Sequence, residues 1–146
     1  MIVLDTHTLI WWVTNDAALS KKAKTAIERE RAGGEIIVSA ISAWEIAMLV
    51  KRETIAFSMD VENWLATVQQ IPGVRFAPVD VDVSLKSVQL PGEFHKDPAD
   101  RLIVGGCPGF CVNGFSFTPA PSGLRTGWRS GLGPPSSLGS ASTISC

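Results

Sequence analysis

Short apolar runs alternate with segments of helical periodicity through the first 104 residues, and this alternation limits the possible folds more than any other feature. Two apolar runs rich in β-branched residues predict buried strands at residues 1–5 and 35–40, and residues 74–80 form a third run that is a candidate strand. The helical segments between and after these runs begin at serine or aspartate caps and end at glycine or proline. Strands separated by helices pair in parallel, so we expect an α/β fold with a parallel sheet between helical layers.

The alternation ends where the composition changes, at Gly105. All 14 acidic residues precede it, and residues 105–146 contain no aspartate, glutamate or lysine. That tail is rich in glycine, proline and serine, which predicts disorder. We therefore expect a folded domain over residues 1–104 and a disordered tail over residues 105–146. The glycines and proline after Val104 also predict that a helix begun at Asp97 ends after about one turn.

Several classes of protein are excluded or disfavoured. The N-terminus lacks the basic segment of a secretory signal, and no apolar run approaches the roughly 20 residues that span a bilayer, so we expect no membrane association. Residues 1–104 contain no cysteine, as suits a cytoplasmic protein. The three cysteines of the tail lack the spacing and histidine partners of a zinc site. No phosphate-binding loop or serine nucleophile elbow is present.

Four carboxylates occupy positions where α/β proteins place their sites. Asp5 ends the first predicted strand, Glu45 lies in the first turn of the helix predicted to begin at Ser42, and Asp97 and Asp100 begin a later helix. These positions converge at the carboxyl ends of the strands. Clustered carboxylates repel each other unless a cation neutralises them, and oxygen ligands select Mg²⁺ or Mn²⁺. The pattern favours metal-assisted hydrolysis of a phosphate ester.

Each of these carboxylates also has a purely structural interpretation. Glu45 stands three residues after Ser42, in the spacing of a capping box. Asp97 is a suitable N-cap, Asp100 suits the positive end of a helix dipole, and Asp5 is placed to cap the helix that follows it. Position alone leaves both interpretations open.

Three blocks, MIVLDTHTLIWW, SAISAWEIAMLVKR and HKDPADRLIV, together resemble the PIN-domain family, and specifically its VapC-type toxins. The resemblance covers residues 1–104. It implies a PIN-like three-layer sandwich and a Mg²⁺- or Mn²⁺-dependent endoribonuclease that forms a homodimer and binds a cognate antitoxin. Carried over by motif, Asp5, Glu45 and Asp100 are the expected catalytic and metal-binding acids, and Asp97 is a secondary metal ligand.

The sequence departs from the family after Val104. Members continue with an alanine-rich turn, a strand and a Thr-x-Asp-like motif that supplies a fourth acid, whereas the tail contains no acid. We therefore expect the sheet to lack its last strand or strands, and we hypothesise that the tail is translated from a shifted reading frame. Two alternatives to an active nuclease follow. One is a catalytically inactive PIN remnant that binds an antitoxin or another protein, and the other is an unrelated α/β binding module whose carboxylates are helix caps.

Overall fold

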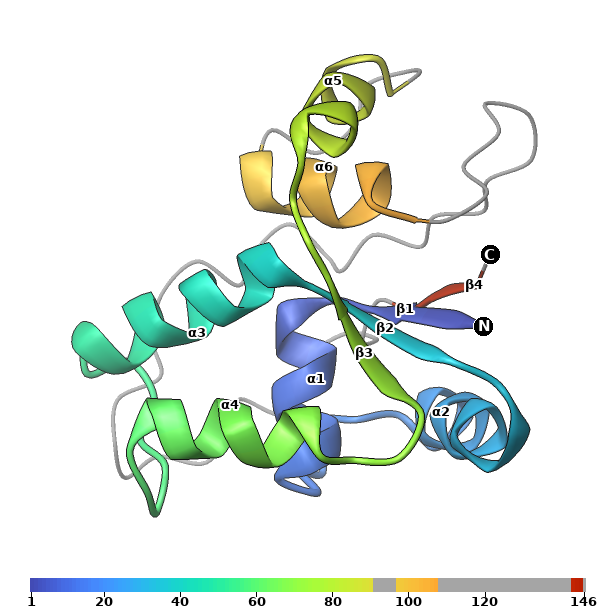
Figure 1. The fold of residues 1–146 in the computed structure, drawn as a ribbon. Coiled ribbons are helices and arrows are strands. Elements are labelled where there is room, and N and C mark those ends of the chain that lie inside the picture. The colour runs from blue at the N-terminus through green and yellow to red at the C-terminus, as the bar shows by residue number, and fades with distance from the viewer. Residues whose placement is uncertain (91–96, 108–142, 146) are drawn as a thin grey trace.

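A computed structural model describes residues 1–90, 97–107 and 143–145, and within them four strands and six helices (Figure 1). The strands are β1 (Ile2–Leu4), β2 (Ile36–Ser39), β3 (Val74–Ala77) and β4 (Thr143–Ser145). The helices are α1 (Thr6–Val13), α2 (Lys21–Gly33), α3 (Ala40–Lys51), α4 (Val61–Gln69), α5 (Val81–Val88) and α6 (Pro98–Gly105). None of the described helices is long and apolar enough to cross a bilayer.

The sheet has the strand order β3–β2–β1–β4. Strands β1, β2 and β3 are parallel, with Ile2 opposite Ile36 and Ile36 opposite Val74. The three predicted strands are therefore confirmed, and so is the parallel α/β arrangement. Strand β4 pairs antiparallel with β1, with Thr143 opposite Leu4.

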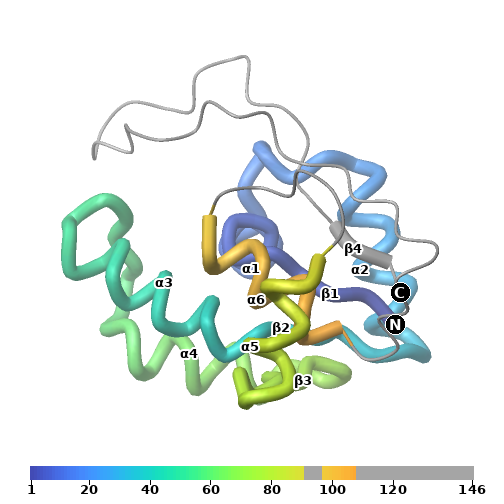
Figure 2. The backbone as a smooth tube through the Cα atoms, turned by 90° about the horizontal axis from the view of Figure 1, so that it is seen from above, coloured from blue at the N-terminus to red at the C-terminus, as the bar shows by residue number. Residues whose placement is uncertain are grey.

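Alternate residues of the strands face two separate cores, which makes the fold a three-layer sandwich. Ile2 and Leu4 belong to one core, together with side chains of α1, α2, α3 and α4. Val3 and Ile37 belong to the other, beneath Ile103 of α6. Figure 1 shows α5 and α6 above the sheet and α1, α2 and α4 below it, and Figure 2 shows α5 and α6 over its centre. Strands buried on both faces read as continuous apolar runs, which is the pattern that predicted them.

Two helices begin at residues other than those predicted. Helix α3 starts directly after β2 and is capped by Ser39, whose Oγ accepts a hydrogen bond from the Ile41 backbone N–H at 3.4 Å. Ser42 is therefore not the cap, and Glu45 lies in the second turn of α3 rather than the first. For helix α4 the sequence offers Ser58 as the predicted cap, but the helix is capped by Asp60, two residues later. In both cases the sequence offers two competent caps close together.

Helix α6 has eight residues, so the prediction of a single turn is wrong. Its second turn is stabilised by packing, because Ile103 and Val104 are buried in the core above the sheet. Gly105 fits where α6 crosses α5, since a Cβ atom there would lie 2.9 Å from the Val83 carbonyl oxygen. Arg101 donates from Nε to the Ser87 carbonyl at 3.0 Å and joins the same two helices.

The packed structure thus continues past the predicted boundary at residue 104, and the Cys107 side chain is also buried. Strand β4 lies in the tail, where the sequence predicts no strand. The rest of the segment predicted to be disordered, including Cys111 and Cys146, lies outside the described residues.

Candidate functional site

Asp5 lies at the carboxyl end of β1, in the turn that leads into α1. It occupies the N-cap position with extended backbone angles, and its side chain makes no capping hydrogen bond. Its carboxylate is 19% exposed. The capping interpretation of Asp5 is therefore wrong, and its carboxylate is left to interact across the edge of the sheet.

Glu45 projects from α3 towards the start of α1. One of its carboxylate oxygens, Oε2, accepts a hydrogen bond from the Thr6 hydroxyl at 2.6 Å. Thr6 Oγ1 also lies 2.9 Å from Ser42 Oγ, so three side chains from two helices form one polar cluster. The capping-box interpretation of Glu45 is wrong, because α3 begins at Ala40 and the partner of the Glu45 carboxylate is on another helix.

Asp97 and Asp100 enter the same region from the beginning of α6, which packs against α3. Asp97 does cap its helix, since its Oδ1 accepts a hydrogen bond from the Ala99 backbone N–H at 3.1 Å. Asp100 lies in the first turn, as expected. Capping engages one oxygen of Asp97, so this residue combines a structural role with a place near the other acids.

The charges of these acids affect the pKa values of two groups of the site, Glu45 and His7. Burial raises the pKa of the Glu45 carboxyl above its ordinary value; the hydrogen bond from Thr6 opposes this, and the charges of Asp5 and Asp97 raise it further. The pKa of His7 is also raised, mainly by its side-chain interaction with Asp5 and against the effect of burial, with smaller contributions from the charges of Glu45 and Asp100. The charges of Asp5 and Asp97 therefore act on Glu45, and those of Asp5, Glu45 and Asp100 act on His7.

Among the described residues, the basic side chain that lies beside Asp5 is that of His7. Its Nδ1 lies 3.8 Å from Asp5 Oδ2, and its side chain is 45% exposed. Its ring also contacts that of Trp11 at a centroid distance of 6.0 Å. The sequence favours His7 as a polar residue at a helix start over a site residue, and the structure places its ring beside Asp5.

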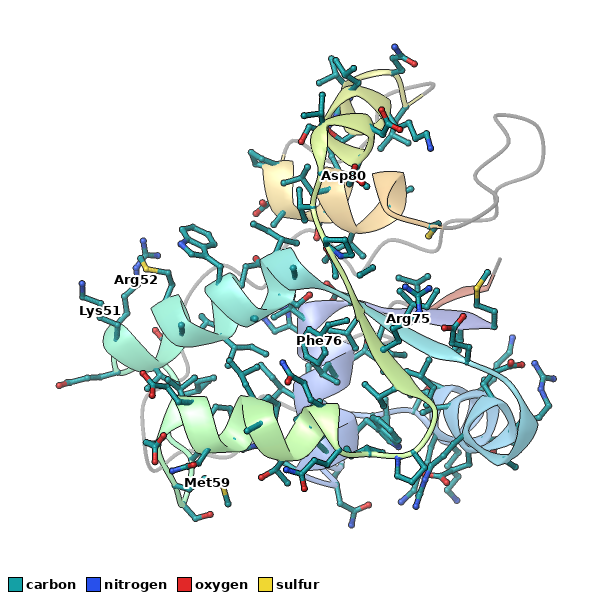
Figure 3. The ribbon with its side chains drawn as sticks, viewed as in Figure 1. Lys51, Arg52, Met59, Arg75, Phe76 and Asp80 are labelled. Atoms are coloured by element: carbon teal, nitrogen blue, oxygen red, sulfur yellow. The ribbon has the colours of Figure 1, made fainter. Side chains whose placement is uncertain are left out.

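Asp5 and Glu45 are not neutralised by lysine or arginine within the part of the chain that the structure describes. Neither Asp5 nor Glu45 forms an ion pair with either residue type there. Lys51 and Arg52 lie at the end of α3 remote from the sheet (Figure 3). Arg101, the basic residue directly after Asp100, donates hydrogen bonds to the carbonyl oxygens of Ser87 and Val88 instead.

A divalent cation suits this site by the chemistry of its donors. The four acids offer carboxylate oxygens, which are the ligands of Mg²⁺ and Mn²⁺. A bound cation would favour the ionised form of Glu45, which burial and the charges of Asp5 and Asp97 oppose. Across residues 1–90 and 97–107, however, no three acidic, histidine or cysteine side chains are already grouped closely enough to hold an ion. His95 and Lys96 directly precede Asp97 in the sequence, where they could contact a phosphate or be solvated loop residues, and they lie outside the described residues.

Sequence reasoning missed Thr6 as part of the site and gave Ser42 a capping role. Both side chains are buried, with exposures of 1% and 0%. A buried hydroxyl needs a hydrogen-bond partner, and here the partners are separated by 36 and 39 residues in the chain. The available signal was a polar residue directly after Asp5 in an otherwise apolar segment, and a serine one helical turn before Glu45.

Comparison with known proteins identifies the family. Residues 2–106 match the PIN domain, and the chain therefore belongs to the PIN-domain family. Ribonuclease VapC22 of Mycobacterium tuberculosis (strain ATCC 25618 / H37Rv) is 38% identical to the chain over 102 residues, which cover 70% of the chain and 75% of the relative. No solved structure matches the chain. The family match ends at residue 106, next to the change in composition.

Proposed function

We propose that this protein is a metal-dependent endoribonuclease and the toxin of a toxin–antitoxin pair. The proposal is supported by four acids carried by neighbouring elements. Glu45 on α3 accepts a hydrogen bond from Thr6, the neighbour of Asp5, and Asp97 and Asp100 begin α6, which packs against α3. The charges of Asp5 and Asp97 also raise the pKa of Glu45. The similarity to a ribonuclease of the VapC type supports RNA as the substrate.

In this proposal, Asp5, Glu45 and Asp100 are the catalytic acids and hold Mg²⁺ or Mn²⁺, with Asp97 as a secondary ligand. A bound divalent cation activates water and neutralises charge that develops on a phosphodiester during hydrolysis. Asp5 is suited to this because its side chain is not used for capping. Glu45 is suited because its position is fixed by a hydrogen bond from a buried side chain.

The partners follow from the same assignment. We propose RNA as substrate, a cognate antitoxin protein, a homodimer, and a cytoplasmic location. The PIN-domain match supports a protein of this kind, and the described helices include none that could span a membrane.

The decisive experiment measures cleavage of a single-stranded RNA by the full chain in Mg²⁺ or Mn²⁺ and again with excess chelator. We expect cleavage that requires the metal and falls at least about 100-fold in Asp5→Asn, because a carboxylate needed for charge stabilisation is lost. Asp82→Asn is the matched control, since this exposed acid on α5 makes the same charge change away from the site. Equal cleavage by wild type and Asp5→Asn would refute the proposal.

One observation favours a second function. The tail contains no acidic residue, so the fourth carboxylate of the family has no counterpart after Asp100. The chain would then be a catalytically inactive PIN remnant that still binds an antitoxin or another protein. Stable binding of the antitoxin encoded beside this gene, with no metal-dependent cleavage by wild type, would establish this alternative.

A further inference from the structure

The hydroxyl of Thr6 occupies the centre of the contact between α1 and α3. It lies 2.6 Å from Glu45 Oε2 and 2.9 Å from Ser42 Oγ, and Thr6 directly follows Asp5 in the chain. Thr6 is 1% exposed and Ser42 is 0% exposed. Neither hydroxyl can therefore touch an RNA strand, and any effect on catalysis must pass through another residue.

The number of protons fixes the direction of the two hydrogen bonds when Glu45 is ionised. A threonine hydroxyl has one proton and two acceptor lone pairs, whereas an ionised carboxylate can only accept. Thr6 therefore donates to Glu45, and the contact with Ser42 is completed by the serine proton. The result is a directed chain from Ser42 through Thr6 to Glu45, and the last bond is of the stronger, charge-assisted type.

This chain holds Glu45 where its charge is unfavourable. Burial and the neighbouring charges of Asp5 and Asp97 oppose ionisation of Glu45, while the hydrogen bond from Thr6 favours it. A free glutamate side chain would rotate away from two acidic neighbours. The bond engages Oε2, and among the described residues no hydrogen bond or ion pair engages Oε1.

We infer that Thr6 is a positioning residue for the metal site: with Ser42 behind it, Thr6 fixes the Glu45 carboxylate beside Asp5 with one oxygen available to a divalent cation. This inference rests on the proposed function, because it gives Glu45 the role of a metal ligand. It adds two residues that do not touch metal or substrate themselves. Partners that orient a ligating carboxylate commonly change metal affinity by about 10- to 100-fold when they are removed.

The test compares Thr6→Val, which keeps the shape and removes the hydroxyl, with Thr6→Ser, which keeps the hydroxyl. Mn²⁺ affinity is measured on the full chain by electron paramagnetic resonance of free Mn²⁺, and RNA cleavage gives kcat and KM. Thr67→Val is the matched control, because the Thr67 hydroxyl is exposed on α4 and bonds the carbonyl of its own helix. Urea unfolding of each variant reports its stability.

We expect Thr6→Val to weaken Mn²⁺ binding by about 10- to 100-fold and to lower kcat with little change in the KM for RNA. Thr6→Ser should restore binding to within a few-fold of wild type, and Ser42→Ala should cause a smaller loss than Thr6→Val. If Thr6→Val does not fold, weaker Mn²⁺ binding in folded Ser42→Ala, with near-normal binding in Thr6→Ser, supports the inference. If Thr6→Val folds, wild-type Mn²⁺ affinity in both Thr6→Val and Ser42→Ala overturns the inference. If Thr6→Val is unfolded, wild-type Mn²⁺ affinity in Ser42→Ala overturns it.

Failure of this inference is distinguishable from failure of the proposed function through Glu45→Gln. If Glu45→Gln loses Mn²⁺ binding and cleavage while Thr6→Val retains both, Glu45 is a ligand but Thr6 does not position it. If Glu45→Gln behaves as wild type in both assays, the role of Glu45 fails, and the positioning role of Thr6 fails with it.

Discussion

Replacing Gly105 with alanine tests whether the packing of α6 on α5 depends on a residue without a side chain. A Cβ atom at this position would lie 2.9 Å from the Val83 carbonyl oxygen, 3.0 Å from the Ser87 backbone nitrogen and 3.2 Å from the Ser87 Cα. These are backbone atoms of α5 and cannot rotate aside. To reach ordinary contact distances, the two helices must separate locally by roughly 0.5 Å.

The magnitude follows from two opposing effects. Overpacking a close contact costs about 1 to 3 kcal/mol. Alanine at a helical position gains up to about 1 kcal/mol over glycine, and less at the last residue of a helix. We therefore expect Gly105→Ala to lower the free energy of unfolding by about 1 to 2 kcal/mol. Gly33→Ala is the matched control, because Gly33 also ends a helix but a Cβ atom there meets nothing within 4 Å.

The assay is urea unfolding followed by tryptophan fluorescence. At a typical slope for a small domain, the expected loss lowers the midpoint of Gly105→Ala by about 0.5 to 1 M urea. Gly33→Ala should be unchanged or stabilised by no more than about 1 kcal/mol. If Gly105→Ala is as stable as wild type while the control behaves as expected, the close approach of α5 and α6 is not a constraint on the fold.

Two further predictions concern the charges of the site. The pKa of Glu45 is raised, mainly because burial opposes its ionisation. The protein therefore loses free energy of unfolding as the pH rises through the folded-state pKa of Glu45. Glu45→Gln should therefore raise the free energy of unfolding at pH 7 without metal, and adding Mn²⁺ should stabilise wild type more than the variant; the opposite order would contradict both the pKa direction and the role of Glu45. The pKa of His7 is raised, mainly by its interaction with Asp5. This interaction contributes stability that is fully present below about pH 6.5 and is lost as the pH rises through the folded-state pKa of His7. The difference in unfolding free energy between wild type and His7→Gln should be larger at pH 6 than at pH 8, and a difference independent of pH would refute this explanation.

The layered fold was predictable because its evidence is local. Strands β1 and β2 are buried on both faces, and this produces the uninterrupted apolar runs at residues 2–4 and 36–38. Strand β3 is only partly buried, and Arg75 interrupts its apolar residues. The cap of α3 was not predictable in the same way. Ser39 and Ser42 are both suitable caps, and the choice depends on Ser42 being buried against Thr6, a contact between residues far apart in the chain.

The length of α6 illustrates the same limit. Local propensity predicts that glycines at residues 105 and 106 end the helix early, and the helix does end there. Its second turn nevertheless forms, because Ile103 and Val104 are buried above the sheet and the first glycine allows α5 to approach. Gly105 would weaken an isolated helix, but in this fold its lack of a side chain allows α6 to pack against α5.

The site acids could be identified as candidates from position, but their roles could not be separated. Asp5, Glu45 and Asp97 each matched a helix cap in the sequence, and the structure supports that interpretation for Asp97 alone. The difference lies in hydrogen-bond partners. The carboxylate of Asp97 meets its own helix, that of Glu45 meets a residue 39 positions away, and that of Asp5 faces His7. Long-range contacts of this kind leave no periodic pattern in a sequence.

The elements that present the four acids end close to the change in composition at Gly105. Helix α6 ends at Gly105, and the core above the sheet closes with Cys107. Beyond it, β4 pairs antiparallel with β1, so that Thr143 lies opposite Leu4, the neighbour of Asp5. Because residues 105–146 contain no aspartate or glutamate, the tail supplies no acidic side chain to this edge. In the proposed site, binding of a divalent cation therefore depends on Asp5 at the end of β1, Glu45 on α3 and the two acids of α6. With fewer carboxylates, the orientation of each one has more influence on affinity. This is why the bond from Thr6 to Glu45 is the contact whose loss should best separate an active nuclease from an inactive remnant.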